Sequence, residues 1–171
     1  MDTFFEQIVS IRKNGKTLAA MFGIWFAALI LAYVIFAFLL AFIGGIAMLV
    51  IFGLFFGAWK LSGLLNIEYE YIITNGSMDI DKIINKSSRK RMASFELGNV
   101  TRLEKFNPHM LNTLDKKTLV YACNENDENA YLLIAEREGK SSVNVIFSPD
   151  ERIKGAIEKF APKFIVNSAF K

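Results

Sequence analysis

The sequence predicts a membrane α-helical hairpin followed by a mainly β soluble domain. Three observations support this fold class. Residues 17–59 contain no charged side chain, Gly44-Gly45 interrupts that run near its middle, and short alternating runs separated by turn residues follow residue 65. We therefore expect an N-terminal segment at 1–16, a transmembrane hairpin at 17–65 and a cytoplasmic domain at 66–171.

The uncharged run is too long for one membrane span. A helix rises about 1.5 Å per residue, so the run would reach roughly 64 Å, about twice the hydrocarbon core of a bilayer. We expect two helices, about 18–43 and 46–65, turned by the glycine pair. A cleaved signal peptide is the alternative, but the run far exceeds the roughly 7 to 15 residues of an h-region, and no small-residue cleavage site closes it.

The basic residues that flank the spans predict the orientation. Arg12, Lys13 and Lys16 precede the first span and Lys60 follows the second, whereas the segment between them has no Lys or Arg. The positive-inside rule then places both termini in the cytoplasm of a multi-pass cell-membrane protein. The single Cys123 agrees with a reducing compartment.

The N-terminal segment has the spacing of a short amphipathic helix over residues 3–13. Thr3 and Glu6 have capping-box spacing, and helical spacing would bring the apolar side chains Phe4, Phe5, Ile8 and Val9 to one face. We expect this helix to lie on the inner membrane surface and to end at Asn14-Gly15.

Small residues recur in the hairpin at the four-residue spacing that allows close helix approach in lipid. The candidate packing residues are Ala37, Ala41, Gly53 and Gly57. They fit either packing of the two spans on each other or a homo-oligomer seam. Since residues 17–59 contain no Asp, Glu, Lys, Arg or His, the sequence does not favour a channel or pump.

Seven strands and one helix are expected after residue 65. Alternation of strand-forming residues and intervening turns place the strands at 67–74, 78–84, 91–97, 100–106, 118–123, 130–136 and 142–147. Asn75-Gly76 is a hairpin turn signal. Ile153, Ala156, Ile157 and Phe160 have helical spacing within 149–164, where Pro162 kinks or stops the helix.

This order resembles the pleckstrin-homology (PH) superfold, a bent seven-stranded sandwich capped by a C-terminal helix. The resemblance covers about residues 67–165 and is closest to bacterial PH-like domains that follow a two-span hairpin. It rests on 68–73 with Asn75-Gly76, Ile80 and 83–86, on Phe95-Glu96-Leu97 with Val100, and on Phe147-Ser148-Pro149-Asp150-Glu151. The resemblance implies a fold but no activity, because this fold hosts many functions.

A basic cluster is the candidate binding site. Five positive residues and no acid occur within ten positions: Lys82, Lys86, Arg89, Lys90 and Arg91. The spacing of Lys86, Arg89 and Arg91 is similar to that of inositide-binding residues in eukaryotic PH domains, although the run here follows the second expected strand. The cluster fits a solvated turn, contact with an anionic lipid surface, or an acidic protein partner.

No constellation of catalytic or metal-binding residues is predicted. Asp79 and Asp81 would share a solvated strand face, His109 lies in a link, and Cys123 fits a small buried residue. We expect neither an enzyme nor a cofactor; an enzyme with an unrecognised site would depend on His109 or Cys123. Residues 60–171 hold 17 basic and 15 acidic residues, a balance too even to favour nucleic-acid binding.

These observations predict a membrane-anchored, non-enzymatic binding or scaffolding module that contacts anionic lipid or a protein partner. The alternative is a structural subunit of a larger membrane complex, assembled through the hairpin.

Overall fold

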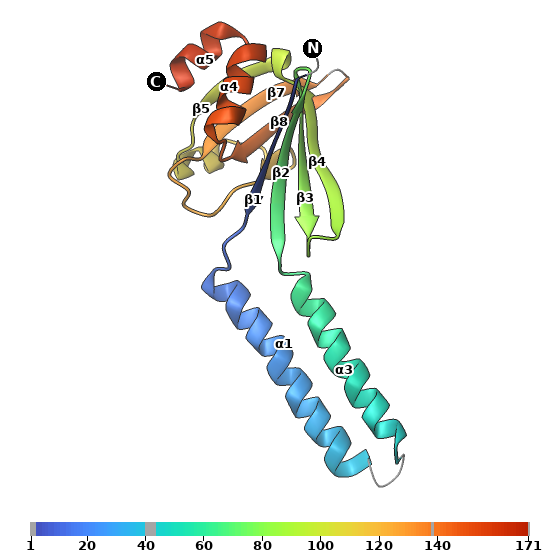
Figure 1. Ribbon diagram of the computed structural model, residues 1–171. Coiled ribbons are helices and arrows are strands. Elements are labelled where there is room, and N and C mark those ends of the chain that lie inside the picture. Colours follow the sequence, from blue (N-terminus) through green and yellow to red (C-terminus); the bar gives the residue numbers. More distant parts are fainter. Residues whose placement is uncertain (1–2, 40–43, 138, 171) are drawn as a thin grey trace. The chain divides into compact units, whose positions relative to one another are not determined.

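The computed structural model describes residues 3–39, 44–137 and 139–170 (Figure 1). The chain forms two compact units. One comprises Arg12–Ile67 with Ile84–Lys86, and the other comprises Met1–Ile11, Glu68–Ile83 and Ser87–Lys171. The first contains the two apolar helices, and the second contains most residues of the two sheets.

The hairpin unit contains two apolar helices. Helix α1 (Gly15–Val34) continues into the π-helical η1 (Ile35–Leu39), and α3 (Ile46–Gly63) follows. Both are long and apolar enough to cross a membrane, with mean hydropathy 2.4 for Gly15–Phe38 and 1.8 for Ile46–Gly63. Only 11% and 22% of these windows are buried, so neither helix resembles the core helix of a soluble protein.

The expected N-terminal helix is wrong, because Phe4–Ser10 forms strand β1. It pairs antiparallel with β2 (Ile67–Thr74) from Phe4↔Thr74 to Ser10↔Glu68. Every second side chain of β1 points toward the core, as in a strand with one buried face. Over seven residues this two-residue repeat of apolar side chains cannot be distinguished from the 3.6-residue repeat of a helix. Asn14 does not end a helix either: its side chain accepts a 2.9 Å hydrogen bond from the Thr17 N–H and caps the start of α1.

The two apolar helices are therefore an insertion between two paired strands of one sheet. In the described residues the first sheet has the order β1-β2-β3-β4, with β3 at Ser77–Ile84 and β4 at Ser88–Glu96. The expected Asn75-Gly76 turn joins β2 to β3, and both residues have positive φ, 50° and 94°. Glycine suits the second position because its lack of a Cβ removes the steric penalty.

The second sheet has the order β5-β7-β8-β6. Its strands are β5 (Val100–Lys105), β6 (Leu119–Tyr121), β7 (Tyr131–Arg137) and β8 (Lys140–Phe147). Strand β7 pairs antiparallel with β5 and β8, whereas the short β6 runs parallel to β8. Each of the seven expected strands thus overlaps one of β2 to β8, and β1 is additional to them.

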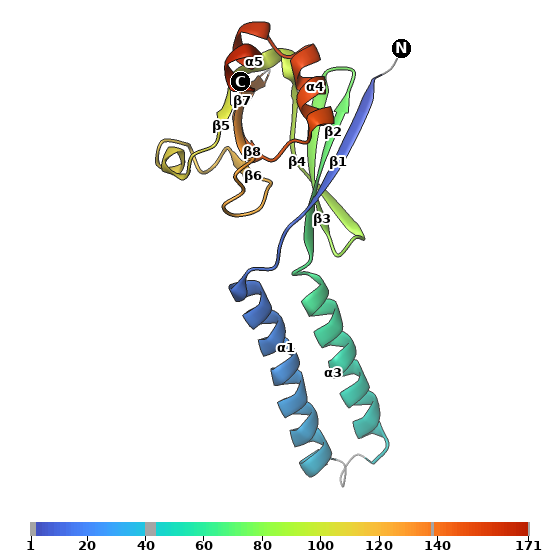
Figure 2. The same ribbon diagram turned by 60° about the vertical axis from the view of Figure 1, so that its left-hand side comes forward.

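In the described residues two helices, rather than the single one expected over 149–164, follow the second sheet; Figures 1 and 2 show both at the end of the chain. Asp150 caps α4 (Glu151–Phe160), since its side chain accepts a 2.8 Å hydrogen bond from the Ile153 N–H. Pro162 then precedes α5 (Lys163–Ala169), because proline cannot continue the first helix. Ile153 and Ile157 of α4 and Val166 of α5 are buried in the main apolar core between the sheets.

Candidate functional site

The basic cluster lies on the β3–β4 hairpin. Lys82 is in β3, Lys86 is in the turn, and the other three residues, Arg89, Lys90 and Arg91, are in β4. Asn85 and Lys86 in the turn have positive φ, 52° and 55°. The structure therefore brings the five residues to one hairpin, as their sequence proximity requires.

Arg91 is held by carboxylates of the neighbouring strand. Its Nη1 lies 2.6 Å from Asp79 Oδ2, and its Nε donates a hydrogen bond to Asp81 Oδ1. The hydrogen bond to Asp81 is the main cause of the raised pKa of Arg91. The expected solvated face for these two aspartates is wrong for Asp81, which is 7% exposed and buried under the arginine.

Arg89 approaches Glu70 of β2, a carboxylate that is fully buried. Arg89 Nη1 lies 3.0 Å from Glu70 Oε2, yet neither carboxylate oxygen has a hydrogen-bond partner of ordinary geometry. Burial raises the pKa of Glu70, the nearby carboxylate of Glu6 raises it further, and Arg89 opposes both effects. A buried carboxylate with one half-exposed cation is expensive to ionise.

Two of the five cluster residues are thus partly neutralised within the sheet, and three remain available. Among the described residues, Lys82, Lys86 and Lys90 take part in no ion pair. The sequence did not reveal this division, because Glu70, Asp79 and Asp81 lie outside the basic run and reach it only through strand pairing. The set of basic residues without an internal ion pair is therefore smaller than the sequence suggests.

The turn that carries Lys86 belongs to the same compact unit as the apolar helices. The Asn85 N–H donates a 2.8 Å hydrogen bond to the Asn66 carbonyl just after α3. A Cβ built on Gly63 would lie 2.9 Å from Asn85 Nδ2, so the turn packs closely against the end of α3. Lys60 is in the last turn of that helix, with its ammonium 5.3 Å from the Trp59 ring centroid.

A second candidate site is a cavity of about 720 Å³ on the second sheet. Its lining includes Phe106 after β5, Leu111 of the 3₁₀ segment η3 (Pro108–Asn112), and Tyr121 of β6. The loop between β6 and β7 adds Glu125, Asp127 and Glu128. Residues from such distant parts of the sequence gave no common motif, and sequence reasoning missed this site.

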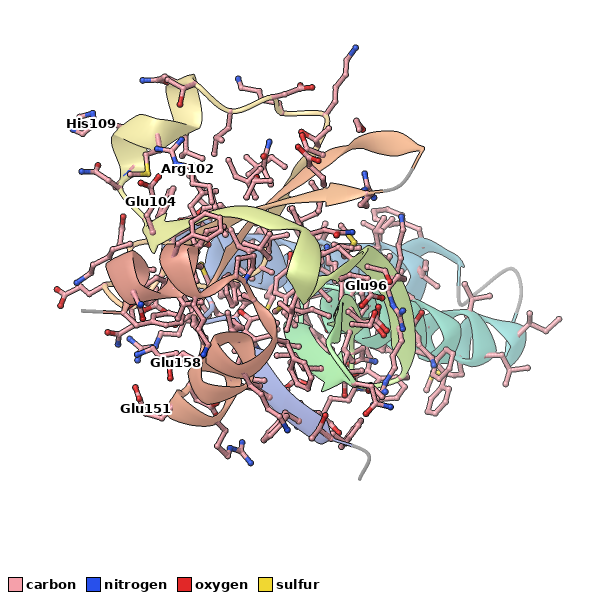
Figure 3. The ribbon with its side chains drawn as sticks, turned by 90° about the horizontal axis from the view of Figure 1, so that it is seen from above. Glu96, Arg102, Glu104, His109, Glu151 and Glu158 are labelled. Atoms are coloured by element: carbon pink, nitrogen blue, oxygen red, sulfur yellow. The ribbon has the colours of Figure 1, made fainter. Side chains whose placement is uncertain are left out.

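The remaining candidate residues are His109 and Cys123. His109 is exposed on η3, and Figure 3 shows it well away from the helix residues Glu151 and Glu158. Cys123 is buried, as expected, and burial together with Asp127 raises the pKa of its thiol to about 12. In the described ranges, no three His, Cys, Asp or Glu side chains are placed to hold a metal ion.

The small residues of the apolar helices divide into two groups, and the candidate packing residues Gly53 and Gly57 are in the group that is not buried against α1. Ala28 and Ala32 of α1 and Ala47 and Ala58 of α3 are buried. A Cβ on Gly53 or Gly57 would meet no atom within 4 Å, so these glycines lie away from α1. Ala37 lies within η1, and Ala41 lies outside the described residues.

Comparison with known proteins identifies a family that includes both the apolar helices and the two sheets. A family model described as "Bacterial PH-like domain (DUF6106)" matches residues 1–167. No curated protein and no solved structure matches the chain. The match includes β1 and the hairpin as well as the two sheets, and two sheets with C-terminal helices fit a PH-like domain. The chain therefore belongs to the bacterial PH-like domain family DUF6106.

Proposed function

We propose that this protein is an integral membrane protein whose helical hairpin holds a PH-like domain at the cytoplasmic surface. There the domain acts as a non-enzymatic binding or scaffolding module. PH-like domains are in general binding or scaffolding modules, and the family match covers both parts of the chain. The lipid contact, the topology and the absence of catalysis belong to this proposal.

The main support for the proposal is the antiparallel pairing of β1 with β2. Ser10 pairs with Glu68, although the whole hairpin lies between them in sequence. Two strands that share hydrogen bonds must lie on the same side of a bilayer, so the chain between them crosses an even number of times. Two spans satisfy this requirement, and the residues that flank them, Arg12, Lys13, Lys16 and Lys60, favour the cytoplasmic side.

The same pairing gives the domain two covalent attachments to the membrane. Only residues 11–14 separate β1 from α1, and only residues 64–66 separate α3 from β2. At about 3.3 to 3.6 Å per extended residue, these connections are too short for the domain to diffuse away from the bilayer. The domain is suited to reading or organising what lies at the surface.

Anionic lipid headgroups are the proposed contact of the lysines on the β3–β4 hairpin. Lys82, Lys86 and Lys90 are free of internal ion pairs in the described part of the chain, unlike Arg89 and Arg91. An anionic leaflet attracts each nearby basic residue by about 1 kcal/mol, so three lysines supply roughly 3 kcal/mol without a specific pocket. This attraction would fix one edge of the domain against the leaflet.

Thiol labelling tests the topology. In a Cys123→Ala background, a cysteine replaces either Gly45 between the spans or Lys116 in the soluble domain. A membrane-impermeant maleimide added to intact bacterial cells should label position 45 only, and position 116 should react after the cells are opened. Labelling of both positions, or of neither, in intact cells would contradict the proposed topology.

Lipid proximity tests the surface contact. The full chain carries an environment-sensitive fluorophore on Ser88→Cys and is placed in nanodiscs of neutral or partly anionic lipid with a headgroup quencher. Quenching should rise with anionic lipid and fall when Lys82, Lys86 and Lys90 become serine. The matched control converts the exposed Lys116, Lys117 and Lys163 to serine and should keep wild-type quenching; equal loss in both variants rules out a local contact.

The outward glycines favour a second candidate function, a structural subunit of a larger membrane complex. Gly53 and Gly57 lie one helical turn apart, and neither is used in packing against α1. Small residues at this spacing let a second helix approach closely in lipid. In that case the hairpin, rather than the lysines, would carry the interaction.

A further inference from the structure

The cavity on the second sheet combines an aromatic floor with an acidic rim. Phe106 and Tyr121 meet edge to face, with ring centroids 6.0 Å apart. Both rings and Leu111 pack on a small buried cluster around Cys123 and Leu132, on the side of the sheet away from the main core. The cavity volume of about 720 Å³ lies within the range of about 300 to 1,000 Å³ that is typical of ligand sites.

The rim of the cavity is mainly acidic. Glu125, Asp127 and Glu128 line the cavity, and among the described residues Lys105 is the one basic residue of its lining. Within residues 3–39, 44–137 and 139–170, none of the three acids forms an ion pair. Burial, Cys123 and the acids of the loop raise the pKa of Tyr121 to about 12, so its phenol stays neutral at physiological pH.

We propose that this cavity binds a basic, apolar segment of a partner protein. A lysine or arginine of the segment lies against Glu125, Asp127 and Glu128, and an adjacent apolar side chain rests on Phe106, Leu111 and Tyr121. The faces of the two rings also attract cations, which adds to the charge complementarity. An anionic lipid headgroup is excluded as occupant because the rim would repel it.

The loop that carries the rim acids is bonded to the end of β1, and this indicates which class of partner protein would bind the cavity. The Asn124 side chain donates a 3.4 Å hydrogen bond to the carbonyl of Ser10, the last residue of β1. Helix α1 begins only five residues later, at Gly15. Membrane proteins display lysine and arginine beside their apolar spans on the cytoplasmic side. A juxtamembrane segment of another membrane protein has the chemistry that the cavity fits, and this identification rests on the function proposed above.

A defined peptide tests the cavity. The probe is a fluorescein-labelled octapeptide that alternates four lysines with two leucines and two phenylalanines. Its binding to the full chain in nanodiscs of neutral phosphatidylcholine is measured by fluorescence anisotropy, with empty nanodiscs as background. One comparison peptide carries glutamate in place of lysine, and another carries serine in place of the apolar residues; both should bind at least about tenfold more weakly.

Two double variants with the same change in net charge distinguish the effect of the rim acids on peptide binding from the effect of acidic residues elsewhere on the protein. Glu125→Gln with Glu128→Gln removes two exposed rim charges and should weaken binding of the lysine peptide by about fivefold to tenfold. Glu96→Gln with Glu158→Gln changes exposed acids on other elements (Figure 3) and should leave the affinity unchanged. Leu111→Ala should weaken the lysine peptide about threefold and leave its serine counterpart unaffected.

The proposal is overturned if the Glu125→Gln, Glu128→Gln variant binds the lysine peptide as tightly as the wild type does. It is also overturned if the Glu96→Gln, Glu158→Gln control is weakened to the same extent, or if the wild type binds the glutamate peptide as tightly as the lysine peptide. These outcomes are independent of the proposed topology and lipid contact. The topology is tested by thiol labelling and the lipid contact by headgroup quenching, and neither experiment measures binding to the cavity.

Discussion

Gln7 and Asp150 join β1, the strand before the apolar helices, to the start of α4. Gln7 Oε1 accepts a 2.8 Å hydrogen bond from the Asp150 N–H, and its Nε2 donates a 2.9 Å hydrogen bond to the Ser148 carbonyl. The side chain of Gln7 thus links β1 to a residue 143 positions later in the sequence. Gln7, near the N-terminus, therefore fixes the start of α4 against β1.

Replacing Gln7 with Ala should destabilise the domain by about 1 to 3 kcal/mol, since two hydrogen bonds are lost at a partly buried site. Hydrogen exchange of the full chain should become faster in β1 and at the start of α4. Ser10→Ala, on the exposed end of the same strand, serves as the control and should change exchange little. Unchanged protection in Gln7→Ala would show that strand pairing alone holds β1.

Arg91 and Lys90 should differ sharply although they are neighbours in one basic run. Arg91→Ser leaves Asp81 buried without its guanidinium and should cost about 1 to 2 kcal/mol. Lys90→Ser should change stability by less than about 0.5 kcal/mol, because its side chain is exposed and forms no ion pair in the described structure. Denaturant unfolding followed by near-ultraviolet circular dichroism measures both; equal effects would contradict the assignment of Arg91 to the sheet.

Glu70 should make stability depend on pH. Its pKa is higher in the folded state than in the unfolded state, mainly because it is buried. Such a carboxyl stabilises the fold when it is protonated, and this contribution disappears as the pH rises through its folded pKa. Relative to Glu70→Gln, the wild type should therefore gain stability on acidification from pH 8 to pH 5.

Thermal unfolding midpoints of the two proteins at several pH values measure this gap. Glu96→Gln removes an exposed carboxyl from β4 and controls for the loss of one acidic residue. A gap between wild type and Glu70→Gln that is constant with pH would mean that Glu70 has the same pKa in both states.

Large residues at the two sets of small positions in the hairpin should have different effects. Ala28→Leu with Ala58→Leu overpacks buried positions and should cost about 1 to 3 kcal/mol. Gly53→Leu with Gly57→Leu meets open space and should be tolerated by the hairpin itself. Light scattering in detergent should then show an unchanged oligomeric state; a shift to smaller species would favour the structural-subunit function.

The sequence predicted the elements whose pattern is local. The strands β2 to β8 and the Asn75-Gly76 turn follow from alternation and turn residues, and the two apolar helices follow from the uncharged run. Strand β1 was missed because seven residues fit both periods, and only its partner, up to 70 positions away at Phe4↔Thr74, decides between them. The break at Pro162 was expected, whereas the second helix beyond it was not.

The candidate sites were harder to predict, because charge neutralisation depends on neighbours in space. The basic run was visible in the sequence, but the pairing of Arg91 with Asp79 and Asp81 requires the strand alignment. The acidic cavity joins residues from the β5 end, η3, β6 and a loop, none of which is unusual alone.

The insertion of the hairpin between β1 and β2 also sets an order of events during synthesis. The ribosome produces β1 first, yet its pairing partner emerges only after the entire apolar segment has been made. Until then β1 remains an unpaired strand with exposed hydrogen-bonding groups, a state prone to wrong association. If the apolar helices span a membrane as proposed above, a chain with only one inserted helix would place β1 and β2 on opposite sides of the bilayer. The sheet could then close only after both helices had been inserted.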